Sequence, residues 1–326
     1  MKVEPLPSVE PAVFQCSSIG SVHGTLAQSQ GRIGRVINVF DTTINIRTDG
    51  DELLVLTLGK TKSPINVNVV GAGPAHSTGF AGLARQGSDA VRTKCAGRTM
   101  IQAGRVLVSI DRQDIFQNSL DEPAAEALRT FASASGRVSS ALAGEAEKGR
   151  TGCLLRPDIT TAGLLNAFSG RLLSGWCDTQ DGMAEALAGL CGRGPGFTPA
   201  GDDFIAGYLA MFNWLCSALE LGPPIIPGGE FLRLTTWTSF KLMEYSARDL
   251  LDEQAQSMLN SVAGGRADDY VRCIEVIGKR GHTSGIDFAT GATFGLYTVA
   301  DSVCGTRSLG DISGRLGITS SGPQLS

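Results

Sequence analysis

The first third of the chain alternates apolar and polar residues, the pattern of β-strands that bury one face. Isoleucine and valine occupy mostly alternate positions over residues 32–47, and 53–58 is an apolar run. Asp49-Gly50 lies between these two segments and predicts a hairpin turn. Residues 65–69 alternate isoleucine and valine with asparagine, and 106–110 is a further apolar segment. The sequence therefore predicts a β-rich N-terminal domain over residues 1–120.

Beyond this region apolar residues recur at helical spacing. The alanine-rich segment 123–147 predicts a first helix, and 231–262 predicts one long helix or two in tandem. We therefore expect an α+β protein, in which residues 121–307 form a mostly α-helical C-terminal domain. The glycine- and serine-rich segment 308–326 is predicted to be a flexible tail.

The helical part is organised around a glycine loop that leads into a strongly apolar segment, residues 191–221. Gly192, Gly194 and Gly196 alternate with arginine and proline, which no regular helix would accommodate. Thr198-Pro199 then predicts an N-cap followed by proline at the first helical position. The residues that follow are apolar on most helical faces, so we expect this helix to be central and buried.

Three residues in the first turn of this helix are candidates for chemistry: Gly201, Asp202 and Asp203. A glycine loop before a helix leaves backbone amides free, which favours an anion site. Two carboxylates would repel a bare phosphate, so they suit capping, a divalent cation, or hydrogen bonds from a polar substrate group. A tight turn with aspartates that only stabilise the helix dipole remains the alternative.

A second segment, residues 281–295, has a similar design. Gly201 to Gly207 and Gly285 to Gly291 both read G-x-D-F-x-x-G, and each leads into an apolar helix. We infer no duplication from so short a match. The pattern predicts two helix starts that each place an aspartate one turn before a glycine on the same face. If the two helix starts face each other, Asp203 and Asp287 share one pocket.

Composition excludes several classes of function. A net charge of −4 and a pI near 5.5, with no long basic run, argue against a nucleic-acid partner. The eight cysteines show no metal-binding or disulfide spacing. The sequence contains no P-loop and no nucleophile elbow. The N-terminus has no signal-peptide pattern and the apolar run after Asp203 is interrupted by polar residues, so we expect a cytoplasmic protein without membrane contact.

The two segments GPGFTPAGDDFIAG and GHTSGIDFATG resemble the signature segments of a bacterial family of formally unknown function. The best-known relative in that family is the third subunit of oxamate carbamoyltransferase, which acts in allantoin degradation. The resemblance extends from about residue 15 to about residue 300, and its first motif is the more specific. It implies a subunit that takes part in carbamoyl transfer between an oxamate-type molecule and phosphate, together with other subunits.

The resemblance and the motif chemistry together predict a set of site residues. We expect Asp203, Asp287 and His282 to be catalytic, with His282 as hydrogen-bond donor, acid or base; a helix-capping histidine is the alternative. Arg193 is the obvious partner for an anion, and its alternative is a solvated loop arginine. The predicted substrate-binding residues are Arg193, Gly194, Gly196, Thr198, Gly201, Asp202, Thr283, Ser284 and Gly285.

No metal or other cofactor is predicted, because adjacent aspartates at a helix start more often cap than bind metal. Mg²⁺ is the ion that Asp202, Asp203 and Asp287 would suit. No activated nucleophile accompanies these residues, so we expect a transferase subunit that is inactive without its partners. The alternative is a non-catalytic scaffold subunit whose glycine loops form a protein interface.

Overall fold

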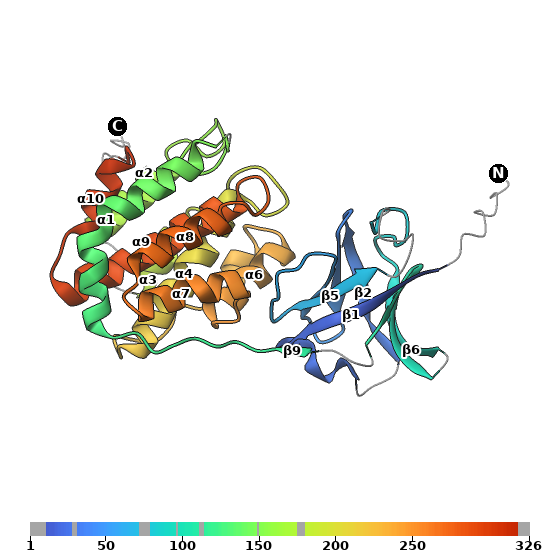
Figure 1. The fold of residues 1–326 in the computed structure, drawn as a ribbon. Helices are drawn as coiled ribbons and strands as arrows, with labels where there is room; N and C mark the ends of the chain where they lie inside the picture. Colours follow the sequence, from blue (N-terminus) through green and yellow to red (C-terminus); the bar gives the residue numbers. More distant parts are fainter. Residues whose placement is uncertain are drawn as a thin grey trace. The chain divides into compact units, whose positions relative to one another are not determined.

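The protein is described by a computed structural model, which covers residues 11–27, 31–71, 79–95, 97–110, 114–148, 150–174 and 180–318. The chain divides into two compact units, Met1–Asn118 and Ser119–Ser326. The first unit is built from β-strands and the second from helices (Figure 1). The predicted α+β class, with its β-rich part preceding its helical part, is confirmed.

The described part of the first unit forms one nine-stranded sheet in the order β5-β4-β3-β2-β6-β7-β8-β1-β9. Because β1 pairs with β8 on one side and with β5 on the other, the strands from β5 round to β1 close into a barrel. The short strand β9 adds to the end of β1 in parallel. The strands are β1 Ala12–Gly20, β2 Gly31–Val39, β3 Thr43–Thr48, β4 Leu53–Thr57, β5 Asn66–Gly71, β6 Asp89–Cys95, β7 Arg98–Ala103, β8 Val106–Ser109 and β9 Asp114–Phe116.

The alternating pattern in the sequence corresponds to the inside and outside of this barrel. β3 and β4 pair antiparallel around the turn that Asp49-Gly50 predicted, with Ile44 opposite Leu56. Both of these side chains are fully buried, as is Phe14 of β1, whose ring packs edge-on against Phe80 at 5.2 Å. Each such apolar side chain contributes roughly 2 kcal/mol when it leaves water.

The second unit is helical over most of its described length. Its helices are α1 Ala125–Ala146, α2 Leu164–Leu173, α3 Gln180–Ala188, α4 Ala200–Ala218, α5 Gly229–Leu232, α6 Trp237–Ala247, α7 Glu253–Ala263, α8 Ala267–Ile277, α9 Ser284–Cys304 and α10 Ser308–Arg315. Among the described residues, none of these helices combines the length and apolarity needed to cross a bilayer.

The C-terminal segment differs from the prediction of a flexible tail. Residues 308–315 form α10, which buries Leu309 and Ile312 in the helical core. The carboxylate of Asp301 accepts hydrogen bonds from the amides of Ser308 and Leu309, at 2.8 and 2.9 Å, and so caps this helix. The glycine and serine content concealed a short amphipathic helix. Residues 319–326 lie outside the described part of the chain.

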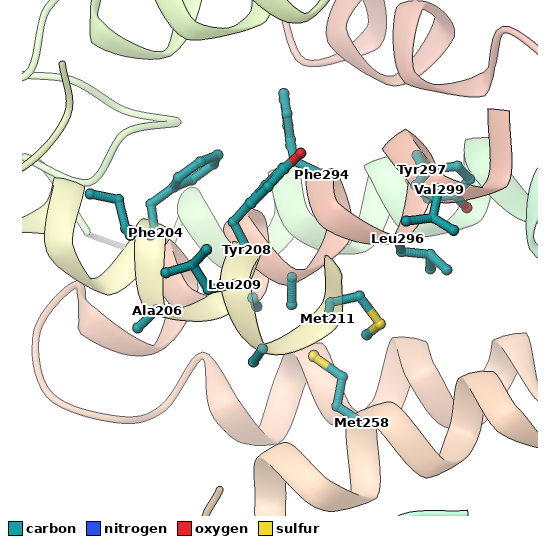
Figure 2. Close-up of a cluster of buried hydrophobic side chains, with 14 of the residues drawn as sticks. Phe204, Ala206, Tyr208, Leu209, Met211, Met258, Phe294, Leu296, Tyr297 and Val299 are labelled. Atoms are coloured by element: carbon teal, nitrogen blue, oxygen red, sulfur yellow. The ribbon is translucent and has the colours of Figure 1, made fainter. Parts of the chain in front are cut away.

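Helices α4 and α9 form the centre of this unit, as the apolar pattern of α4 predicted. Figure 2 shows Phe204 and Tyr208 of α4 beside Phe294 of α9. The rings of Phe204 and Phe294 meet edge to face with centroids 5.6 Å apart, and Phe204 and Tyr208 stack at 6.4 Å. All three residues are fully buried.

The second glycine of each G-x-D-F-x-x-G segment lets these two helices approach closely. A Cβ on Gly207 would lie 2.0 Å from the carbonyl oxygen of Phe288, and a Cβ on Gly291 would lie 1.9 Å from that of Phe204. The contact is therefore reciprocal, since each glycine accommodates the phenylalanine carbonyl of the other helix. Glycine has no Cβ, and this absence allows the two backbones to approach so closely.

Candidate functional site

The crossing of α4 and α9 brings the starts of both helices together. The hydroxyl groups of Thr198, two residues before α4, and Ser284, the first residue of α9, are hydrogen-bonded at 3.0 Å. Thr198 was predicted to cap α4, but the N-cap position belongs to Pro199 and has no side-chain cap. The Thr198 side chain instead joins the two signature segments.

The glycine loop before α4 is held from inside by Asp202, which is 2% exposed. Its Oδ1 accepts a hydrogen bond from the Gly192 amide at 2.6 Å, and its Oδ2 accepts one from the hydroxyl of Thr235. At Gly192, where φ is 72°, a Cβ would lie only 2.0 Å from the Leu234 carbonyl oxygen. Both carboxylate oxygens serve the chain itself, which favours a loop-fixing role for Asp202 over substrate binding.

The backbone amides at the helix starts are largely occupied by carbonyls of the chain. The Gly201 amide donates to the Arg193 carbonyl at 2.9 Å, and the amides of Asp202 and Asp203 donate to the Pro199 carbonyl. At α9 the Gly285 amide donates to the Arg280 carbonyl at 3.2 Å. An anion at these helix starts therefore has fewer free amides than the glycine pattern predicted.

The space beside the predicted substrate-binding glycines varies along the two loops. A Cβ on Gly201 would lie 1.9 Å from the Leu190 carbonyl oxygen, and one on Gly285 would lie 1.8 Å from the Ile277 carbonyl oxygen. A Cβ on Gly194 would lie 2.9 Å from Ala200. Gly196 is exposed, and the nearest atom to its Cβ position is 3.5 Å away. Of these four glycines, Gly196 leaves the most room for another group.

Asp203 lies at the junction of the two segments. Burial raises the pKa of its carboxyl group to about 7, while hydrogen bonds from Ser284 and Thr198 act in the opposite direction. The neighbouring charge of Asp202 raises the pKa further, and that of Arg280 lowers it. The Oδ2 atom is shielded from solvent and has no hydrogen-bond partner in the described part of the chain.

Asp287, the equivalent residue of α9, is 1% exposed. Its Oδ1 accepts a hydrogen bond from the Leu154 amide at 2.8 Å. Burial raises its pKa well above the ordinary value, the Leu154 and Thr283 hydrogen bonds lower it, and the charge of Asp203 raises it. The two aspartates are therefore electrostatically coupled, and within the described residues the Oδ2 of Asp287 also has no partner.

Arg193 and His282 lie at the edge of this arrangement. Both are exposed, and Thr283 beside His282 is buried. Arg150 donates from Nη1 to the His282 carbonyl oxygen at 3.2 Å, and its Nε donates to the Glu145 carbonyl at 3.1 Å. The backbone at His282 is thus fixed by a residue outside the signature segments, while the imidazole faces solvent.

Two elements near the aspartates were not identified from the sequence. Arg280 donates from Nε to Gln254 at 2.7 Å and from Nη2 to Asp252, and its charge acts on Asp203. The segment 150–161 contributes the Leu154 amide to Asp287, and its Thr161 methyl lies 3.1 Å from the Cβ position of Gly194. The Lys279-Arg280 pair directly before Gly281 was the available signal for Arg280.

The described residues contain no group of three or more histidine, cysteine, aspartate or glutamate side chains placed to hold a metal ion. A cavity of about 730 Å³ lies elsewhere in the helical unit, with Phe212, Asp301 and Arg307 in its lining. None of the predicted site residues lines it. The candidate site is therefore the junction of the two helix starts, with its two coupled carboxyl groups.

The fold is that of an α+β protein. In its helical domain, the two signature segments meet at the N-terminal ends of α4 and α9. Residues 190–296 match the family described as oxamate carbamoyltransferase subunit AllH. The matched segment contains both signature motifs, and it supports membership of the chain in that family, as the resemblance predicted. No curated protein sequence and no solved structure gives a significant match.

Proposed function

We propose that this chain is a subunit of an oxamate-carbamoyltransferase-type complex in the cytoplasm. Its helix starts bind the small carbamoyl or carboxylate substrate, or phosphate. The family match supports the assignment to such a complex. The observation that carries the site is the meeting of both signature segments at the Thr198–Ser284 hydrogen bond, beside Asp203 and Asp287.

Carbamoyl transfer from the nitrogen of an N-carbamoylated oxamate to phosphate breaks the bond between that nitrogen and the carbamoyl carbon and forms a bond to a phosphate oxygen. The oxamate nitrogen leaves with a proton, and negative charge develops on the carbamoyl oxygen during the transfer. A carboxyl group that stays protonated near pH 7 can donate a hydrogen bond to that oxygen. Asp287 has the raised pKa that this task requires. Arg193 and His282, both exposed, are available to phosphate or to the substrate carboxylate.

The chain is proposed to act only within its complex. Positioning and charge stabilisation suffice in principle for this transfer, since no covalent enzyme intermediate is needed. The test is to purify the complex from its native host and to assay carbamoyl transfer by the chain alone and by the complex. We expect turnover by the complex and none by the chain alone; efficient formation of carbamoyl phosphate by the isolated chain would refute this dependence.

A second function, a non-catalytic interface, is favoured by apolar exposure beside the glycine loop. Ile159 is 96% exposed and Phe197 is 38% exposed. If the loops serve only as an interface, then Asp203→Asn and Asp287→Ala complexes retain full activity. If the site binds substrate, both variants assemble with their partners but lose most of their activity.

A further inference from the structure

The two carboxyl oxygens without partners mark a place where a ligand group would fit chemically. Buried polar atoms in native proteins are nearly always hydrogen-bonded, so an unpaired one requires an explanation. Among the described residues, Oδ2 of Asp203 and Oδ2 of Asp287 are two such atoms, on residues in equivalent positions of crossing helices, and the charge of Asp203 acts on Asp287. Asp287 is almost completely buried and its other oxygen is already engaged by the Leu154 amide.

The surroundings decide how many protons the pair holds. The charged or titratable neighbours are Asp202 on α4, Arg280 before α9 and the thiol of Cys153 on the segment 150–161. Arg280 is the cation among them, and it is already bonded to Asp252 and Gln254. Asp287 is the more deeply buried of the two and its pKa is raised well above the ordinary value, so when the pair holds a single proton Asp287 is the residue that carries it. The pair then presents one O–H donor and one carboxylate acceptor.

A primary amide has the complementary groups, because its carbonyl oxygen accepts and its NH₂ donates. We propose, building on the function above, that Asp203 and Asp287 recognise the primary amide of the oxamate-type substrate. The protonated carboxyl group of Asp287 donates to the amide oxygen, and the carboxylate of Asp203 accepts from the amide nitrogen. A carboxylate group presents only acceptors near pH 7, so it leaves Asp203 facing like charge.

A ligand reaches the pair through the contact between the two loops. Both Oδ2 atoms are shielded from solvent, and the Thr198–Ser284 hydrogen bond joins the segments beside them. Because both atoms are shielded, ligand access requires this contact to open. Gly196, two residues before Thr198, is exposed, and the nearest atom to its Cβ position is 3.5 Å away.

The test compares oxamate with oxalate, which replaces the amide by a carboxylate at nearly constant size. Titration calorimetry is performed on the full-length chain and on the assembled complex. We expect oxamate to bind at pH 7 and oxalate to bind at least about tenfold more weakly. Oxalate lacks the NH₂ donor, so it would leave the acceptor oxygen of Asp203 without a hydrogen bond. Equal affinity for the two, or no oxamate binding to either sample, overturns the proposal. Mg²⁺ binding that Asp203→Asn removes also overturns it.

Three variants separate recognition from folding. Asp287→Asn keeps a donor at every pH, so oxamate affinity stays within about threefold of the unmodified chain and no longer falls at high pH. Asp287→Ala removes the donor and weakens binding by about tenfold or more. Asp249→Asn is the matched control, since it alters another aspartate, half-buried and outside both motifs, that has a buried oxygen without a partner among the described residues; it leaves affinity unchanged.

The outcomes distinguish this inference from the proposed function. If the complex transfers carbamoyl groups but the chain shows no preference for oxamate, the function stands and the amide assignment fails. If transfer activity does not depend on this chain at all, the proposed function fails first. A loss of oxamate binding in Asp287→Asn, with an unchanged circular dichroism spectrum, also contradicts the assignment.

Discussion

Replacement of Gly207 by alanine tests the reciprocal contact between α4 and α9. Alanine in a helix interior is ordinarily about 1 kcal/mol more favourable than glycine. Here the new methyl group would lie 2.0 Å from the carbonyl oxygen and 2.8 Å from the carbonyl carbon of Phe288. These are backbone atoms that cannot rotate away, so α9 must shift by roughly 1 Å and lose core packing. Overpacking of this kind costs about 3 kcal/mol, which leaves a net destabilisation of about 2 kcal/mol.

The assay is urea unfolding followed by tryptophan fluorescence. All three tryptophans of the chain lie after residue 118, so the signal reports the helical unit. Gly144→Ala in α1 is the matched control, because no atom lies within 4 Å of its Cβ position. It should raise the stability by up to about 1 kcal/mol. A Gly207→Ala chain as stable as the unmodified one, or a control equally destabilised, would refute the reasoning.

Three further predictions concern the aspartates. Asp202→Ala should destabilise the helical unit by about 3 kcal/mol in urea unfolding, because it removes acceptors from Gly192 and Thr235; a loss below about 1 kcal/mol contradicts the loop-fixing role. Asp203 and Asp287 hold protons more tightly when folded, so stability should fall as pH rises from about 4 past 7, by up to about 1.4 kcal/mol per pH unit for each carboxyl. Asp287→Asn should flatten this slope, and an unchanged slope would show that the pair does not titrate as described. Arg280→Gln should raise the pKa of Asp203, measured by carbon-13 NMR of labelled aspartate; no upward shift would remove Arg280 from the site.

The hydrophobic pattern was sufficient for the fold class and for several strands. The hairpin of β3 and β4 followed from alternation around Asp49-Gly50. Strands β6 and β7 were not predicted, because their apolar positions are few and are interrupted by arginine, lysine and threonine. Register and barrel closure depend on β1 pairing with three other strands, a long-range property that no local pattern contains.

The site was harder to predict at the level of single residues. The sequence indicated that Asp202 and Asp203 begin a buried helix, but successive helical residues point about 100° apart. Asp202 therefore turns towards Gly192 and Thr235, and Asp203 turns towards the second motif. Which residue faces which neighbour depends on tertiary packing. The prediction that Thr198 caps α4 was wrong for a similar reason. The actual partner of its hydroxyl group, Ser284, is distant in the sequence and could not be identified from local pattern.

The junction of the two motifs also has a consequence for synthesis of the chain. Thr198 and Ser284 are separated by 86 residues, so their contact has a high sequence separation and forms after the local helices. On the ribosome, α4 emerges with an apolar surface that α9 covers in the folded chain. A chain released before α9 is complete would carry the first motif with no second helix against it. Truncated products of this gene should therefore be recognised by chaperones and degraded instead of accumulating as half-sites.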